Sequence, residues 1–226
     1  MATVILPALW LIVLIVGLPQ FAETVYTPVL PDMAHSLHTS DTLAEYTLTI
    51  YLIGFAVGIL FWGKLSDRIG RKPCVMAGLL IFMLGSVGCY YASTITLLMI
   101  CRFIQALGGS IGSVLGQAIA RDAFQGVQLG RVYASVGSAL AIFPAIGPVL
   151  GGIIATYGDW QSIFLFLVVC AVIVFVQVFL FLPETHHAEN RVRVAMGTVA
   201  VSLFTNKHVI GCGLLVGIYN GISFRF

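Results

Sequence analysis

Charged side chains are scarce in this chain, and their scarcity excludes several classes of protein. Lys and Arg number 11 and Asp and Glu 9 among 226 residues, so only 9% of the chain is charged, whereas an ordinary soluble domain is about 25% charged. Hydrophobic residues make up 59%, which argues against a soluble globular domain. The net charge of +2 is too small, and the basic residues are too scattered, for a nucleic-acid-binding surface.

Paired cysteines and clustered metal ligands are also missing. The five cysteines show no paired spacing and lie in or beside apolar stretches, where cysteine behaves as a small hydrophobic residue: Cys74, Cys89, Cys101, Cys170 and Cys212. Four histidines fall in polar stretches without a metal-ligand spacing, at His35, His38, His186 and His187. We therefore expect no disulfide framework, no metal site and no cofactor.

Long apolar runs are what the chain has in abundance. Six runs are long enough to cross about 30 Å of hydrocarbon as helices, near residues 6–29, 43–62, 74–92, 96–119, 132–156 and 161–182. The first run lacks the basic start and small-residue exit of a signal peptide, so we expect it to remain. The sequence therefore predicts an all-α integral membrane protein. A seventh run begins near residue 208 and stops at Arg225, short of a full span, so the chain looks truncated.

The basic residues lie on one side of the predicted array. They gather in alternate connections, at Lys64, Arg68, Arg71, Lys72, Arg121, Arg131, Arg191, Arg193 and Lys207, whereas the stretches 30–42, 93–95 and 157–160 contain no Lys or Arg. Because Lys and Arg are retained in the cytoplasm, we expect the N-terminus and the segment after the sixth span to be cytoplasmic. Residues 184–207 are more polar than the runs beside them and are interpreted as a linker.

One short charged stretch separates the second and third apolar runs. Residues 63–72 hold five of the 20 charged residues in ten positions, in the order Gly, three residues, Asp-Arg, one residue, Gly-Arg-Lys. This order resembles the signature loop between helices 2 and 3 of the major facilitator superfamily. The resemblance implies a conformational latch, made by that loop and an acidic residue at the inner end of helix 4: Gly63, Asp67, Arg68, Gly70, Arg71, Lys72 and Asp122.

The same resemblance sets the expected domain organisation. Major facilitator proteins consist of two six-helix halves, each containing a three-plus-three inverted repeat. We therefore expect residues 1–183 to form the N-terminal six-helix half, 184–207 a cytoplasmic central linker, and 208–226 part of helix 7 of a missing C-terminal half. The chain alone is expected not to transport.

Arg102 is the single basic residue in the interior of an otherwise uncharged run. An arginine in hydrocarbon costs on the order of 3 kcal/mol, so it should face the bundle interior or a watery cavity. The alternative is a side chain that extends to the outer interface. Residues 102–109, which include Gln105, resemble the family's helix-4 motif associated with proton coupling, with Ala106 in place of a glycine.

Glycines in the same run repeat at a four-residue spacing, at Gly108, Gly112 and Gly116. Such a spacing predicts one helix face that permits close backbone contact. Ser110 also completes a Gly-x-Ser-x-Gly pattern, but a nucleophile elbow requires a strand, a sharp turn and a helix. We therefore predict no catalytic residues and no enzyme activity.

The fifth run contains prolines and glycines that predict a bent, closely packed helix. The residues are Pro144, Gly147, Pro148, Gly151 and Gly152. They resemble the antiporter motif of the drug-exporting branch, although Phe143 stands where fuller versions of the motif have another glycine. The alternative is a packing kink of the kind common in spanning helices.

Glu23 is the acidic residue of the first run. A carboxyl group in a membrane span is a candidate proton carrier that can alternatively pair with a cationic substrate. The alternative is a glutamate at the outer interface, wetted from outside. Residues 23–31 resemble the helix-1 end of Bcr/CflA-type drug exporters, although the acid lies five residues before the first proline of this stretch rather than four.

Together these features predict the N-terminal half of a drug:proton antiporter of the bacterial inner membrane, of the Bcr/CflA type. Its expected partners are an amphipathic small molecule, protons, the lipid bilayer and the missing C-terminal half, with the proton gradient as energy source. A major facilitator that carries another solute, such as a sugar or metabolite, is one alternative. A non-transporting membrane fragment, or a half-transporter that forms homodimers, is another.

Overall fold

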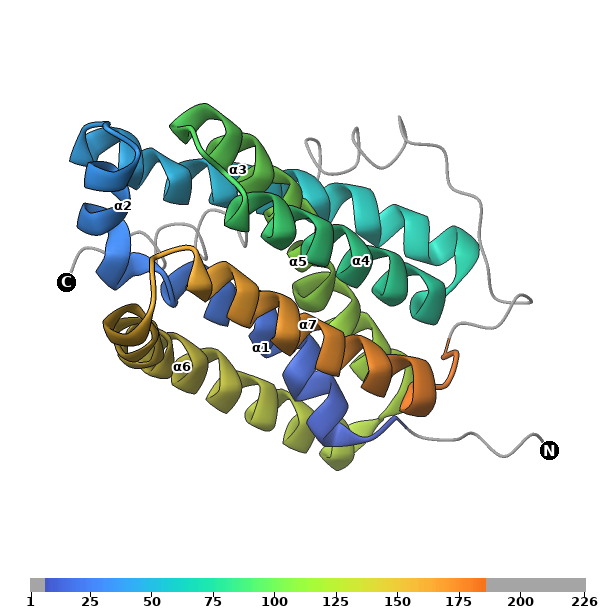
Figure 1. Cartoon of the computed structure of the whole chain (residues 1–226). Helices are drawn as coiled ribbons and strands as arrows, with labels where there is room; N and C mark the ends of the chain where they lie inside the picture. Colours follow the sequence, from blue (N-terminus) through green and yellow to red (C-terminus); the bar gives the residue numbers. More distant parts are fainter. Residues whose placement is uncertain (1–6, 186–226) are drawn as a thin grey trace, which may run out of the picture. The chain divides into compact units, whose positions relative to one another are not determined.

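The computed structural model describes residues 7–185, and six helical segments in this part of the chain are long and apolar enough to cross a membrane (Figure 1). The elements are α1 (Leu9–Thr24), the 3-10 helix η1 (Thr27–Val29), α2 (Leu30–Ser36), α3 (Asp41–Ile69), α4 (Arg71–Tyr90), α5 (Ile95–Ala123), α6 (Gly126–Tyr157) and α7 (Ser162–Phe181). The predictions of an all-α membrane fold and of six spans are confirmed. The seventh apolar run and the linker from residue 186 onward lie outside the described residues.

Local sequence signals explain several helix ends. The hydroxyl of Ser40 accepts a hydrogen bond from the backbone N–H of Leu43 at 3.3 Å, and Thr94 caps Leu97 in the same way at 3.2 Å. Such caps satisfy backbone donors that have no partner inside the helix. The first predicted span is interrupted after α1, where Pro28 and Pro31 occupy first-turn positions of η1 and α2, as expected for residues without a backbone N–H.

The charged stretch at residues 63–72 is not a loop, contrary to the sequence-based prediction. Residues up to Ile69 continue α3, and α4 begins at Arg71, so Gly70 is the single residue between the two helices. Its φ of 106° lies in a region that favours glycine. The 29 residues of α3 extend about 43 Å, which exceeds the hydrocarbon thickness. Charged residues can therefore remain helical while they stand in water.

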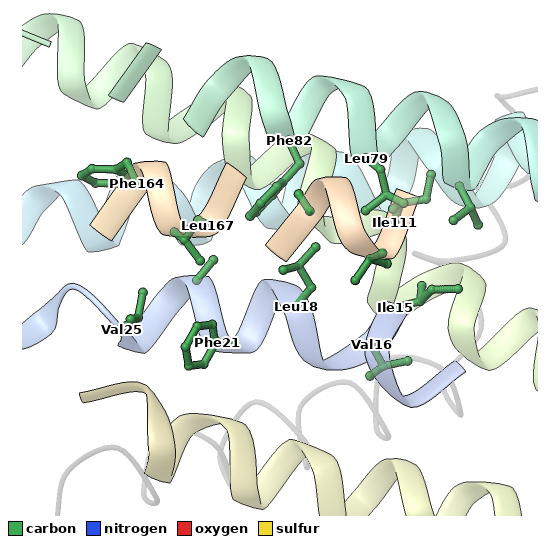
Figure 2. Packing of buried hydrophobic residues seen from close by; sticks show 14 of the residues in the cluster. Ile15, Val16, Leu18, Phe21, Val25, Leu79, Phe82, Ile111, Phe164 and Leu167 are labelled. Carbon is green, nitrogen blue, oxygen red and sulfur yellow. The ribbon is translucent and has the colours of Figure 1, made fainter. Parts of the chain in front are cut away.

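The helices enclose an apolar core with α1 and α5 at its centre. Helix α5 packs against α1, α3 and α4, while α1 also packs against α6 and α7. Figure 2 shows side chains of α1, including Leu18 and Phe21, close to those of α7 and α4, among them Leu167 and Phe82. The core of the described residues is therefore shared by all six spans rather than divided between neighbouring helix pairs.

Small residues allow α5 to approach both partners closely. A side-chain carbon added at Gly108 would meet backbone atoms of α4, and one added at Gly112 would meet the carbonyl oxygen of Ile15 in α1. Gly116 lies against the side chain of Val16. These contacts agree with the close approach that the glycine spacing predicted. Ser110 is buried within continuous helix and donates to the carbonyl of Leu107 at 2.9 Å.

Candidate functional site

Arg102 lies in the interior of the bundle, without any exposed surface. Its Nη1 donates to Oε1 of Gln105 at 2.6 Å and to the carbonyl of Ala22 in α1 at 3.4 Å. The guanidinium carbon lies 4.0 Å from the ring centroid of Tyr26 and 4.2 Å from that of Tyr51. The structure therefore favours the interior position over the side chain that reaches the interface.

Gln105 connects Arg102 to α4. Its Nε2 donates to Oγ of Ser86 at 2.7 Å, and Ser86 donates to the carbonyl of Phe82 at 2.8 Å. All these polar side chains are fully buried. Gly85 makes the contact possible, because a side chain there would collide with the backbone of Gln105. These contacts link α1, α5 and α4. We call the three side chains the buried polar network: Arg102, Gln105 and Ser86.

Glu23 lies beside this network, near the end of α1. It follows Ala22, whose carbonyl accepts the hydrogen bond from Arg102. The side chain is only partly buried, and within residues 7–185 it forms no ion pair. Glu23 is therefore neither sealed in the core nor fully solvated.

Two glycines of α6 hold the end of α1 that carries Glu23. A side-chain carbon added at Gly147 would meet Oγ1 of Thr24, and one added at Gly151 would meet the carbonyl oxygen of Val25. A side-chain carbon added at Gly152, by contrast, would meet no atom of residues 7–185 within 4 Å. Helix α6 runs unbroken past Pro144 and Pro148. The antiporter-like motif therefore lies against the residues that directly follow Glu23.

Phe143 is the departure from that motif, and the structure provides a physical reason for its tolerance. A side-chain carbon added at Gly17 of α1 would collide with the ring of Phe143. The ring also makes an edge contact with Phe21, at 6.3 Å between centroids. The small residue that permits close approach is therefore on α1 rather than on α6. Sequence reasoning missed this exchange because the two positions are far apart in the chain.

Predicted latch residues meet where α3 and α5 end and α4 begins. Arg71 is buried, and its Nη1 donates to Oδ1 of Asp67 at 2.7 Å and to Oγ of Ser66 at 2.6 Å. Its Nε donates to Oδ2 of Asp122 at 3.0 Å. Arg68 is exposed and has no hydrogen bond or ion pair in the described part of the chain.

The predicted latch also includes two glycines, Gly63 and Gly70. A side-chain carbon added at Gly63 would lie 3.7 Å from Cγ1 of Val114 in α5, which is an ordinary contact distance, so packing does not require glycine here. Gly70 supplies the turn that places Arg71 beside Asp67. The structure thus brings Asp67, Arg71 and Asp122 together beside the turn at Gly70, and it leaves Arg68 exposed.

Glu184 joins the latch, although sequence reasoning assigned it to the linker. Its two carboxylate oxygens accept hydrogen bonds from the backbone N–H groups of Arg71, at 2.8 Å, and Lys72, at 3.2 Å, and so cap α4. In return, Nζ of Lys72 donates to the carbonyl of Phe179 in the last turn of α7, at 2.9 Å. The acidic Glu184 thus caps the start of α4, and the cationic Lys72 caps the end of α7. Both placements are favoured by the helix dipoles. The available signal was an acidic residue directly after the sixth span.

Comparison with known proteins identifies the family. A family model described as Major Facilitator Superfamily matches residues 9–226. The chain belongs to the major facilitator superfamily. It is thus a multi-pass membrane protein of a transporter family, and not a member of an enzyme family.

Among curated relatives of this major facilitator chain, an uncharacterized transporter of Rickettsia bellii is 36% identical over 96% of this chain and 54% of the relative. Multidrug resistance protein D of Escherichia coli is 31% identical over 92% of this chain and 52% of the relative. The bicyclomycin resistance protein homolog of Haemophilus influenzae is 30% identical over 86% and 50%. The chain spans about half the length of the curated relatives it matches.

Solved structures support the fold. The peptide transporter POT has a TM-score of 0.71 at 15% identity, over 92% of this chain and 46% of that chain. The human organic anion transporter MFSD10 has a TM-score of 0.65 at 21% identity, over 81% of this chain and 49% of that chain. At such identities the likeness concerns the fold alone. The six spans therefore correspond to half of a major facilitator structure.

Proposed function

We propose that this chain supplies the N-terminal half of a transporter that exports amphipathic or cationic small molecules in exchange for protons. The observation that carries the proposal is the position of Glu23. Within residues 7–185 it forms no ion pair, it lies beside the buried polar network, and the residues that follow it pack against Gly147 and Gly151 of α6. The relatives named for multidrug and bicyclomycin resistance support a drug as substrate.

In this proposal Glu23 binds either a proton or a cationic substrate. A charged carboxylate in a partly buried membrane site is costly, so it is stabilised by one or the other. Competition between the two couples proton entry to substrate release. Arg102 remains fixed by Gln105 and the carbonyl of Ala22, and supplies a constant positive charge near the exchanging group.

The latch provides the second part of the mechanism. Arg71 with its partners Asp67 and Asp122 joins three helices at one end of the bundle. We place this end in the cytoplasm because of the basic residues there, as in Lys64 and Lys72. The latch then stabilises the state that is closed on the cytoplasmic side, and the binding of substrate or proton shifts the balance between the two states. Alternating access follows from rocking against a second half.

The test is drug accumulation in inverted membrane vesicles that contain this chain alone, or this chain together with the second half of E. coli multidrug resistance protein D. We expect uptake of the fluorescent cation ethidium into inverted vesicles only when the second half is present and a proton gradient is imposed. Glu23→Gln should abolish the dependence on the gradient. Gradient-driven uptake by the chain alone, or an unchanged gradient dependence in Glu23→Gln, would contradict the proposal.

A further inference from the structure

The charge of Arg102 is enclosed by aromatic rings rather than by a carboxylate. Tyr26, which precedes η1, and Tyr51 of α3 lie with their ring centroids 4.0 and 4.2 Å from the guanidinium carbon, and the ring of Phe164 in α7 lies at 5.9 Å. Within residues 7–185 no Asp or Glu forms an ion pair with Arg102. The guanidinium is thus held between two rings, with a third at the limit of the interaction distance.

Hydrogen bonds alone do not compensate this buried charge. Nη1 donates to Gln105 and to Ala22, whereas Nε and Nη2 have no partner among the described residues. A buried charge requires a compensating interaction. The faces of aromatic rings carry negative potential and attract a cation within about 6 Å, most strongly where water is absent.

The two tyrosine rings are themselves fixed by their hydroxyl groups. Tyr51 donates to the carbonyl of Pro19 in α1 at 2.9 Å. The hydroxyl oxygens of Tyr26 and Thr47 lie 3.4 Å apart, and Thr47 donates to the carbonyl of Ala44 at 2.6 Å, so Tyr26 is the donor to Thr47. Both rings are almost fully buried. Their positions are therefore set by the protein, independently of Arg102.

We propose that Tyr26 and Tyr51 are positioning residues whose ring faces replace a carboxylate counter-ion for Arg102. Because the rings hold the guanidinium, Glu23 is not consumed as its counter-ion and stays available for exchange. This consequence for proton coupling rests on the proposed function, whereas the interaction between the rings and the cation does not. The interaction between the rings and Arg102 predicts that the electron density of the ring at position 51, and not only its volume, stabilises the chain.

The experiment places phenylalanine at position 51, and then phenylalanines with one, two and three ring fluorines, in the purified 226-residue chain. Fluorine withdraws electron density from the ring face and changes ring size little. We expect the midpoint of thermal unfolding in detergent to fall stepwise, by about 5 °C over the series. The same series in the Arg102→Met background should show no graded fall. A matched control is the same fluorine series at Phe82, which is buried and has no cation over its ring within residues 7–185, and which should therefore show no graded fall.

A flat series at position 51, or equal slopes in the Arg102 chain and the Arg102→Met background, would overturn the proposal. If the fluorinated chains do not fold, Tyr51→Leu and Tyr51→Phe replace them. The extra loss of stability in Tyr51→Leu should then be larger with Arg102 present than in Arg102→Met, and equal losses would overturn the proposal. A graded fall, together with no export when the second half of the transporter is present, would support the ring–cation interaction and contradict only the proposed function.

Discussion

Replacement of Gly151 by alanine tests the contact between α6 and α1 most directly, because the neighbouring Gly152 offers a matched control. The new methyl group of Gly151→Ala would meet the carbonyl oxygen of Val25, whereas that of Gly152→Ala would meet no atom of the described part of the chain within 4 Å. Both substitutions gain about 1 kcal/mol in helix propensity. Only Gly151→Ala also incurs an overpacking cost of about 1–3 kcal/mol. We therefore expect it to be less stable than Gly152→Ala by that amount.

The obstacle at position 151 is backbone, so no side-chain substitution relieves it. Gly147 differs in this respect, because a methyl group there would meet the hydroxyl of Thr24. The loss in Gly147→Ala should therefore be partly recovered by Thr24→Ala, and the loss in Gly151→Ala should not. Thermal unfolding midpoints of the purified variants in one detergent measure both effects. Equal stability of Gly151→Ala and Gly152→Ala would refute the inference that α6 holds the end of α1 by direct backbone contact.

Three further predictions concern other parts of the bundle. Gly17→Ala should lower the unfolding midpoint, because the new methyl group would collide with the ring of Phe143. Phe143→Ala removes that ring and should suppress the loss. Additive losses in the double variant would contradict the pairing of a small residue on α1 with Phe143 on α6. Asp122→Asn removes one of the two carboxylates paired with Arg71 and should cost about 1 kcal/mol in denaturant unfolding, while an unchanged midpoint would argue against a latch at this end. Lys64→Cys should react with a membrane-impermeant maleimide above the wild-type background in inside-out vesicles and not in intact cells, and the reverse pattern would invert the proposed orientation.

Much of the fold was predictable because each apolar run is a local property of the sequence. Arg102 was also predictable as an interior residue, since a lone charge in such a run demands compensation. The prediction of a loop at residues 63–72 was wrong because charge lowers hydropathy without ending a helix. Only Gly70, with its positive φ, interrupts the backbone there.

The partners of the site residues could not be predicted in the same way. Tyr51 faces Arg102, and Glu184 caps the start of α4, across long separations in the chain. Such pairs depend on how helices pack, and an apolar pattern does not specify which faces meet. A tyrosine in a membrane span can face either lipid or the interior of the bundle, and only the fold distinguishes these two positions.

The exchange of caps between α4 and α7 has a consequence for motion. In the three-plus-three repeat of the family, these two helices are the third members of their respective triplets. Lys72 and Glu184 therefore fasten one triplet to the other at the same end of the bundle. Because the two triplets are joined at this end, we expect the six spans to move as one unit.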